Sequence, residues 1–157
     1  MNALVANIQN LPAQQGSQLK EFVTMTVDGQ LLGISVLTVQ DVFKHQKITP
    51  IPLAPKEIAG SLNLRGRIVT AIDVRARLRL SPRDPKAKVM SVVVEYKGEL
   101  YSLLVDSVGE VLALPLEKFE KNPANLSQNW QEVSAGIYRL KSDLLVALDV
   151  SKLLRVG

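Results

Sequence analysis

The chain repeats itself, and this repeat limits the folds that are open to it. Residues 29–43 (GQLLGISVLTVQDVF) align without a gap with residues 98–112 (GELYSLLVDSVGEVL), and residues 60–78 (GSLNLRGRIVTAIDVRARL) align with residues 136–154 (GIYRLKSDLLVALDVSKLL). Glycines, valines, leucines and an aspartate recur at matching positions, whereas chance gives roughly one identity per stretch. The sequence therefore predicts one small structural unit used twice. Exposed positions at which the copies differ most are candidates for function.

Each copy has the pattern of short strands separated by turns. An Asp-Gly pair at 28–29 and a Lys-Gly pair at 97–98 each stand between runs rich in β-branched residues, which is a hairpin signal. Valines recur at every third residue over 36–42 and 105–111. That spacing suits either a helical turn or an irregular strand, and periodicity alone does not decide between them.

Proline and the ends of the repeated segments mark the connections. The proline-rich segments 48–57 and 113–123 cannot complete a sheet ladder, so we expect them to connect strands or to follow sheet edges. Residues 74–80 (VRARLRL) and 150–157 (VSKLLRVG) are interpreted as short helical turns. The strands at 68–73 and 144–149 are apolar on both faces, which predicts that they lie between layers or between the two barrels.

About five short strands in each copy, with little helix, predict an all-β fold. We expect two small five-stranded barrels with short helical turns, packed on each other. The first covers about residues 20–80 and the second about 88–155, with strand exchange between them left open. Residues 1–19, rich in Gln, Asn and Ala, are predicted to be a flexible N-terminal tail preceding the domain at 20–157.

Composition excludes several classes of protein. The chain has no cysteine, so disulfides, thiolate catalysis and cysteine-based zinc sites are excluded, and a reducing cytoplasm fits. No apolar run reaches the length of a membrane span, which argues against direct membrane insertion. The N-terminus lacks the charged head and apolar stretch of a secretory signal.

Positive charge is concentrated in one part of the chain. Residues 65–88 hold eight Arg or Lys residues and two Asp residues, within a chain of net charge +4. A solvated connector is the simplest interpretation, and binding of phosphates or of an acidic protein surface is the alternative. A barrel that binds single-stranded nucleic acid would also use aromatic stacking, and this stretch contains no aromatic residue.

The sequence offers little for catalysis, so we expect no enzyme, no cofactor and no metal site. His45 is the only histidine and has no partner at metal-ligand spacing. Neither a nucleophile elbow nor a phosphate-binding loop is present. Asp73 and Asp149 occupy equivalent places in the two copies, which favours a structural role in accepting backbone hydrogen bonds. A small enzyme that uses these carboxylates is a weaker alternative.

The copies differ most at one tight turn. The first copy has Asn-Leu-Arg-Gly-Arg at 63–67, where the second has Arg-Leu-Lys-Ser-Asp at 139–143. Gly66 permits a backbone with positive φ that Ser142 resists. Arg65 presents a planar fork of five donors where a lysine presents a point charge. An arginine held rigidly in a turn beside an apolar surface is suited to binding another protein.

These residues resemble the CheW family. The resemblance rests on the runs GISVLTVQDV at 33–42, GSLNLRG at 60–66, IDVR at 72–75 and LVDSVGEVL at 104–112, with the segment 136–154. It covers nearly everything from residue 20 to residue 155, and the Asn-Leu-Arg-Gly turn with the Val-Asp-x-Val-x-Glu-Val run makes it specific. The chain has no room for a kinase or receiver domain, so it is similar to a stand-alone CheW-like adaptor.

The resemblance implies two intertwined five-stranded barrels of SH3-like shape and a non-catalytic adaptor. Such adaptors couple the cytoplasmic tips of methyl-accepting chemotaxis receptors to the CheA-type histidine kinase in membrane-associated arrays. It also implies a cytoplasmic protein, monomeric alone, with no nucleic-acid partner. The receptor tip would lie in an apolar groove between the barrels. The implied receptor-binding residues are Val36, Val39, Asp41, Asn63, Arg65, Gly66, Leu104 and Val108, and the implied kinase-binding residues are Gly60 and Glu110.

Two departures from the family pattern and one alternative complete the prediction. Asp41 stands where the family usually has Glu, and its shorter side chain puts a salt bridge from this position in doubt. Thr70 stands where the family often has Pro, which affects local stiffness. The alternative within the family is an adaptor of a non-flagellar chemosensory pathway that controls pili or development.

Overall fold

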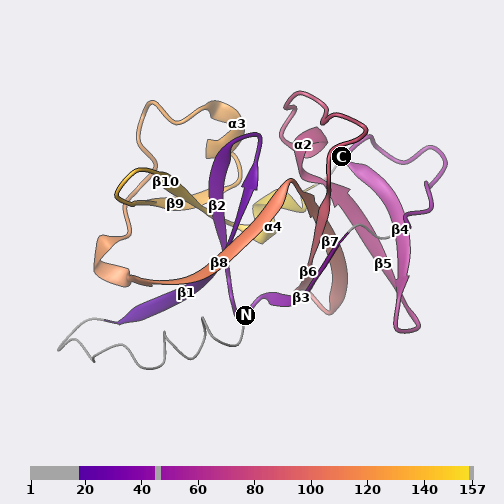
Figure 1. The fold of residues 1–157 in the computed structure, drawn as a ribbon, viewed down its shortest axis with the longest axis horizontal. Coiled ribbons are helices and arrows are strands. Elements are labelled where there is room, and N and C mark those ends of the chain that lie inside the picture. The colour runs from indigo at the N-terminus through magenta and orange to yellow at the C-terminus, as the bar shows by residue number, and fades with distance from the viewer. Residues whose placement is uncertain (1–17, 45–46, 156–157) are drawn as a thin grey trace.

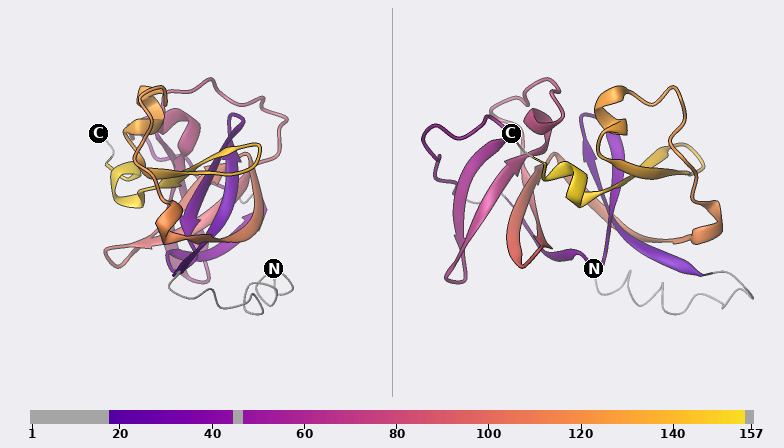
Figure 2. Two further views of the ribbon diagram at one scale, coloured as in Figure 1. Left: turned by 90° about the vertical axis from the view of Figure 1, so that its left-hand side faces the viewer. Right: turned by 180° about the vertical axis from the view of Figure 1, so that it is seen from behind.

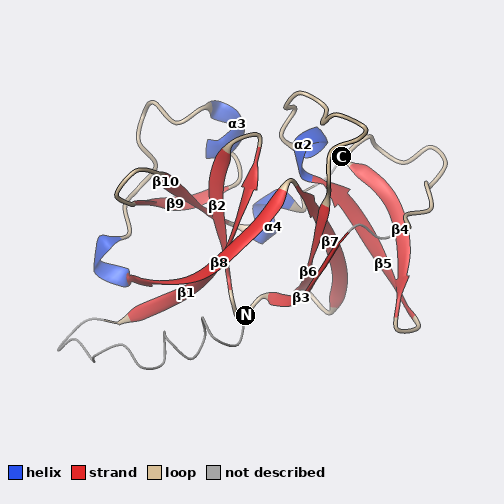
Figure 3. Ribbon diagram, in the orientation of Figure 1, coloured by secondary structure: helices blue, strands red, loops and turns tan. Residues whose placement is uncertain are grey.

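The computed structural model describes residues 18–44 and 47–155, and almost all of its regular structure is β-strand (Figure 3). Its strands are β1 (Leu19–Val27), β2 (Gln30–Ser35), β3 (Val39–Lys44), β4 (Ile58–Leu64), β5 (Arg67–Asp73), β6 (Met90–Tyr96), β7 (Glu99–Val105), β8 (Ser107–Pro115), β9 (Ser134–Arg139) and β10 (Leu144–Leu148). The helices are short: α2 (Val74–Arg77), α3 (Gln128–Gln131), α4 (Val150–Leu153) and the 3-10 turn η1 (Leu116–Lys118).

The strands form two five-stranded sheets that stand side by side (Figure 1). The first sheet has the order β8-β1-β2-β10-β9 and the second has the order β3-β6-β7-β5-β4. Within them β2 pairs with β10 and β5 pairs with β7 in parallel, and the other pairs are antiparallel. The view from behind shows α4 between the two sheets (Figure 2).

Each sheet combines strands from both copies of the repeat. The hairpin β1–β2 of the first copy is completed by β8, β9 and β10 of the second copy. In the same way the hairpin β6–β7 of the second copy is completed by β3, β4 and β5 of the first. The sheets are therefore intertwined, and the sequence copies at 20–80 and 88–155 do not coincide with them. Residues 1–17 of the predicted tail at 1–19 lie outside the described residues. Leu19, which the prediction assigns to the tail, is the first residue of β1.

The structure confirms the predicted all-β fold with two five-stranded units and short helical turns. Each unit is an open barrel, because within residues 18–44 and 47–155 the end strands of a sheet do not pair with one another. The valine-spaced segments, which periodicity left undecided, are mostly strand: residues 36–38 form a turn that leads into β3, and Val105 ends β7 just before β8. The segments predicted as helical turns contain α2 and α4.

Three apolar clusters explain why so many strands are buried on both faces. The largest lies between the sheets and takes residues from both, including Met25 and Ile34 of the first sheet and Val92 and Val94 of the second. A second cluster around Phe22 fills the open barrel of the first sheet. A third cluster, formed by Leu62, Val69, Ala71 and Leu104, fills that of the second sheet. Because neighbouring residues of a strand point to opposite faces, β1 and β7 each contribute to two clusters.

The two aspartates that both copies share cap the short helices. The Asp73 carboxylate accepts hydrogen bonds from the backbone N–H groups of Arg75 and Ala76 at the start of α2. Asp149 caps α4 in the same manner through the N–H groups of Ser151 and Lys152. This confirms the structural interpretation, since a side-chain oxygen here satisfies N–H groups that have no helical partner.

Candidate protein-interaction surface

The turn at which the copies differ most is a two-residue hairpin loop between β4 and β5. Leu64 pairs with Arg67, which leaves Arg65 (φ +51°) and Gly66 (φ +82°) as the loop residues. Positive φ at both loop positions matches the right-handed twist of the strands, and glycine adopts it at low cost. The Asn63 side-chain oxygen accepts a hydrogen bond of 3.0 Å from the Gly66 N–H. Local hydrogen bonding and backbone geometry therefore fix the direction in which Arg65 leaves the turn.

The Arg65 side chain forms an ion pair with Asp41. Its Nη2 atom donates to Asp41 Oδ2 at 3.1 Å, and the side chains are 77% and 29% exposed. Asp41 lies on β3 and Arg65 follows β4, which are the two end strands of the second sheet. The shorter side chain of Asp41 thus reaches its partner after all. The other carboxylate oxygen of Asp41 accepts a hydrogen bond from the Val42 N–H at 2.9 Å, so the acceptor is held in place.

A hollow of about 270 Å³ lies beside this ion pair at the open end of the second sheet. Its lining residues are Gln40, Asp41, Leu64, Arg65, Arg67, Val93 and Leu100. The hollow joins charged and apolar surface within one small area. Such a combination can hold an apolar side chain of a partner while the charges set its orientation.

Three of the predicted apolar contact residues pack against the same apolar cluster, the one between the sheets. Val36, Val39 and Val108 are each half-buried and pack against the cluster between the sheets. They come from both sheets. Val108 pairs with Met25 in the first sheet, and Val39 pairs with Val94 in the second. These valines are therefore partly accessible at the line where the first sheet meets the second.

Leu104, the fourth predicted apolar residue, lies elsewhere. Its side chain is 5% exposed and packs in the interior of the second sheet with Leu62, Val69 and Ala71. It is not brought next to the three valines in the same cluster. Its part in receptor binding stays a prediction.

The predicted kinase-binding residues occupy contrasting environments. Gly60 is buried with φ +149°, and a Cβ there would overlap the backbone oxygen of Thr49, which pairs with Ser61. Gly60 thus permits a close approach of two backbone segments. Glu110 is exposed on β8, an end strand of the first sheet, and its backbone oxygen accepts a hydrogen bond from the Thr24 hydroxyl at 2.6 Å.

The basic stretch at 65–88 is largely used inside the molecule. Besides Arg65, Arg79 pairs with Glu132 at 3.1 Å, and Arg77 donates to the backbone oxygens of Leu153 and Lys152 at the end of α4. These contacts take up charge that a phosphate backbone would otherwise need. They weaken the case for a nucleic-acid site on this stretch.

Arg75 and Arg83 of the same stretch converge on one carboxylate. Arg75 binds both oxygens of Asp106, at 3.1 and 2.7 Å, and Arg83 approaches Asp106 at 3.4 Å and Asp73 at 3.5 Å. The backbone N–H of Asp28, in the turn between β1 and β2, also donates to Asp106 at 2.8 Å. This cluster therefore ties a turn of the first sheet to α2, which follows the second sheet.

The surroundings of Asp106 decide its charge. Burial, the largest single influence, raises the pKa of Asp106, and hydrogen bonds from Arg75 and the Asp28 N–H act in the opposite direction. With the charges of Arg75 and Arg83, they hold the pKa of Asp106 below its ordinary value. The same hydrogen bonding raises the pKa of Arg75 above its ordinary value. The pair is therefore ionised at neutral pH, and it serves to join the sheets.

Sequence reasoning missed this cluster and one exposed apolar residue. Asp106 aligns with Leu37 of the first copy, and a charged residue opposite an apolar one was an available signal. Leu37 is 89% exposed and follows Val36 in the chain, so it adds apolar surface beside Val36. Large exposed apolar side chains grouped together commonly mark protein contacts.

The described part of the chain shows no site suited to metal chemistry or membrane crossing. Among its residues no group of three or more His, Cys, Asp or Glu side chains is arranged to hold a metal ion. Its helices are all too short to span a bilayer. The arrangement of a rigid arginine turn and a half-buried valine edge is suited to binding protein surface.

Comparison with known proteins identifies the family of the chain. The family model of the CheW-like domain matches residues 21–156. The chain belongs to the CheW-like family. This is a family of non-catalytic scaffolding adaptors of chemotaxis, so the expected absence of enzymatic activity follows from membership.

Individual CheW-like relatives align with this chain over nearly their whole length. The chain is 28% identical over 150 residues to the chemotaxis protein CheW of Klebsiella aerogenes, covering 96% of this chain and 89% of that protein. It is 29% identical over 138 residues to the chemotaxis protein CheW of Thermotoga maritima, covering 87% and 89%. The crystal structure of the scaffolding protein CheW from Thermoanaerobacter tengcongensis matches with a TM-score of 0.81 at 27% identity, covering 89% of this chain and 95% of that one.

Proposed function

We propose that this CheW-like chain couples the cytoplasmic tips of methyl-accepting chemotaxis receptors to a CheA-type histidine kinase. In this proposal it works in the cytoplasm, within membrane-associated receptor arrays. The observation that carries the proposal is the Arg65 turn, fixed by Asn63, Gly66 and Asp41 and set apart from its counterpart in the second copy. An adaptor of either a flagellar or a non-flagellar pathway needs both contacts, so the proposal applies to both.

The receptor contact combines two features of different chemistry. The half-buried valines Val36, Val39 and Val108 supply apolar area at the junction of the sheets. Arg65, exposed and held by Asp41, supplies a donor fork of defined direction. A helical receptor tip can place apolar side chains against the valines and a carboxylate or carbonyl group against Arg65.

The kinase contact is proposed to use other surfaces. Gly60 keeps the segment around Thr49 close to β4, and the exposed Ile51 and Leu53 follow directly in that segment. Glu110 presents a charge on an end strand of the first sheet. The two partners would therefore bind to different parts of the molecule, as a coupling protein requires.

The experiment measures binding of the purified chain to a receptor cytoplasmic fragment and to the kinase by calorimetry. We expect Arg65→Ala to weaken receptor binding about tenfold or more, since an anchoring arginine commonly contributes over 1 kcal/mol. Lys141→Ala is the matched control, because Lys141 holds the equivalent turn position in the second copy. Kinase binding should be unchanged in both variants.

Three outcomes would contradict the proposal. Failure of the unsubstituted chain to bind either partner at micromolar concentration overturns the coupling function. Equal weakening by Arg65→Ala and Lys141→Ala overturns the special role of the first turn. Unfolding of Arg65→Ala, detected by circular dichroism, would assign Arg65 a structural role instead.

A further inference from the structure

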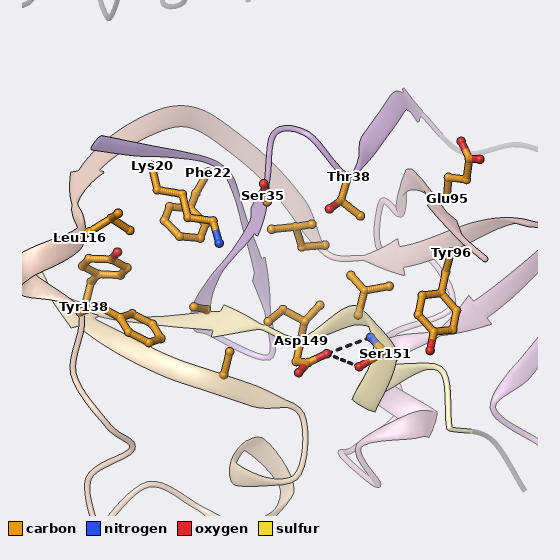
Figure 4. Close-up of a pocket in the computed structure, with 16 residues that line it drawn as sticks. Lys20, Phe22, Ser35, Thr38, Glu95, Tyr96, Leu116, Tyr138, Asp149 and Ser151 are labelled. Atoms are coloured by element: carbon orange, nitrogen blue, oxygen red, sulfur yellow. Dashed lines mark hydrogen bonds between the residues drawn. The ribbon is translucent and has the colours of Figure 1, made fainter. Parts of the chain in front are cut away.

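A cavity of about 390 Å³ is lined by neither the three valines nor Arg65, although its lining residues Ser35 and Thr38 adjoin Val36 and Val39 in the chain (Figure 4). One end is apolar and aromatic, with Phe22, Leu116 and Tyr138. The other end is polar and includes Asp149 of the α4 cap and Glu95 of β6. Figure 4 shows the labelled side chains along an elongated space between the first sheet and the end of β6. A cavity of this size and mixed lining is large enough for side chains of a docked segment.

The apolar end of this cavity is surrounded by apolar surface that nothing in the described chain covers. Leu19 is 43% exposed, Leu116 is 44% exposed and Phe119 is 42% exposed. Leu116 and Phe119 line the cavity, and Leu19 begins β1, whose residues Lys20 and Phe22 line it as well. Grouped apolar side chains at the mouth of a cavity indicate a covering partner.

Tyr138 adds an aromatic ring to the wall of the cavity. Tyr138 is 2% exposed and lines the cavity, and its ring packs against Phe22 and Phe119. An occupant can therefore pack apolar side chains against this group of three rings.

The chain carries a suitable occupant in its first residues. Residues 1–19 contain no charged side chain, and Leu4, Ile8 and Leu11 are spaced by four and three residues. Such spacing places three apolar side chains on one helical face. Pro12 follows directly, at the place where a helix would end.

The described chain begins beside the cavity. The Gln18 backbone oxygen accepts a hydrogen bond of 2.9 Å from the N–H of Leu116, a cavity residue. The six residues 12–17 can span roughly 20 Å when extended. We propose that residues 1–11 dock in this cavity through Leu4, Ile8 and Leu11, against Phe22, Leu116 and Tyr138. The proposal goes beyond receptor and kinase coupling, because neither the three valines nor Arg65 lines the cavity.

The absence of cysteine allows a direct test on the full chain. A nitroxide attached at Ala6→Cys, on the face opposite Leu4 and Ile8, should broaden the amide resonances of cavity residues Ala135 and Ala147 at least twofold. Resonances at the distant Arg65 turn serve as the internal reference. Reduction of the nitroxide should restore all signals.

Two triple variants locate the contact. Leu4→Ser, Ile8→Ser and Leu11→Ser together should abolish the broadening, since they remove the apolar face. Asn2→Ser, Gln9→Ser and Asn10→Ser, a matched change on the opposite face, should preserve at least half of it.

Selective broadening that only the apolar triple removes would support the proposal. No broadening at Ala135 and Ala147, or an equal loss in both triples, would overturn it. Broadening that grows with protein concentration would assign the cavity to a second copy and would also overturn it.

Discussion

The hairpins β4–β5 and β9–β10 occupy equivalent places in the repeat and differ in how tightly their turns are held. The first turn has two loop residues with positive φ, an Asn63 hydrogen bond and an ion pair to β3. The second is closed by a hydrogen bond of 2.8 Å from the Leu140 N–H to the Asp143 oxygen, and Lys141 and Ser142 are exposed. Among the described residues Lys141 forms no ion pair with Glu110, the counterpart of Asp41.

The difference separates what the repeat needs for folding from what one copy adds. Both copies keep the buried glycines Gly60 and Gly136 with positive φ, and both keep the helix-capping aspartates. Only the first copy has a rigid arginine turn. Only the second copy has a carboxylate, Asp106, between two arginines, since the aligned residue of the first copy is Leu37. Shared features should therefore matter for stability in both copies, whereas one-sided features test specialisation.

The largest expected effect concerns the shared glycines. In Gly60→Ala a Cβ would overlap the Thr49 backbone oxygen at a positive φ, so we expect destabilisation of roughly 3 kcal/mol or more. Gly136→Ala should have a cost of the same order, because a Cβ there would overlap the Glu120 backbone oxygen as well as the Phe119 ring, also at a positive φ. Urea unfolding measures both.

Gly98→Ala is the control for the glycine pair. It has φ +78°, and a methyl group added there would meet no other atom within 4 Å. Only backbone strain of about 1–2 kcal/mol is therefore expected. If Gly60→Ala were no worse than Gly98→Ala, the close approach of the two backbone segments would not limit this position.

The next effect tests the one-sided charge cluster. Asp106→Asn leaves Arg75 and Arg83, which are mostly buried, without their shared carboxylate, and we expect a loss of about 2 kcal/mol at pH 7. Because folding lowers the pKa of Asp106, its stabilisation is present above the unfolded pKa of about 3.9. It is lost as pH falls through the folded value.

Urea midpoints between pH 7 and pH 3 provide the check. The difference between the unsubstituted chain and Asp106→Asn should shrink below about pH 4, since protonation of Asp106 removes the charge that the variant already lacks. Asp143→Asn, at an exposed position of the second turn, is the control and should show little difference at any pH. A gap for Asp106→Asn that stays constant with pH would mean that its ionisation contributes nothing.

Local features of this fold were predictable from the sequence, because local chemistry determines them. The turn at Asp28-Gly29, the positive φ of Gly66 and the caps at Asp73 and Asp149 each follow from a residue type at one position. The alternating strands were likewise visible as apolar runs with Gly and Pro between them.

Pairing between distant segments was not predictable in the same way. Periodicity identifies a strand but not its partner, so β2 of one copy beside β10 of the other could only be left open as strand exchange. The burial of Leu104 was not predictable for a related reason. Because β7 is apolar on both faces, alternation of apolar and polar residues does not show which of its side chains are accessible to a partner. Arg75 meets Asp106 across 31 positions of the chain, which charge counting alone does not show.

A smaller effect tests whether the helix caps are equivalent. Asp73→Ala and Asp149→Ala each remove a side-chain acceptor from two backbone N–H groups, which costs about 1 kcal/mol. Asp73 also faces Arg83 at 3.5 Å, so its loss should exceed that of Asp149 slightly. Thermal unfolding of the two variants compares them. A markedly larger loss for Asp149→Ala would show that the C-terminal helix between the sheets matters more than the charge cluster.

The smallest effect on stability is expected at the turn with the strongest functional interpretation. The Arg65–Asp41 pair is largely exposed on the arginine side, and such pairs contribute about 0–1 kcal/mol. Arg65→Ala and Lys141→Ala should therefore change the free energy of unfolding by similar small amounts, within about 0.5 kcal/mol of each other. Since glycine geometry and the Asn63 hydrogen bond already hold the turn, the fold does not depend on the ion pair. Unfolding curves at low and high salt measure this, and a loss above about 2 kcal/mol for Arg65→Ala alone would make the first turn a structural element.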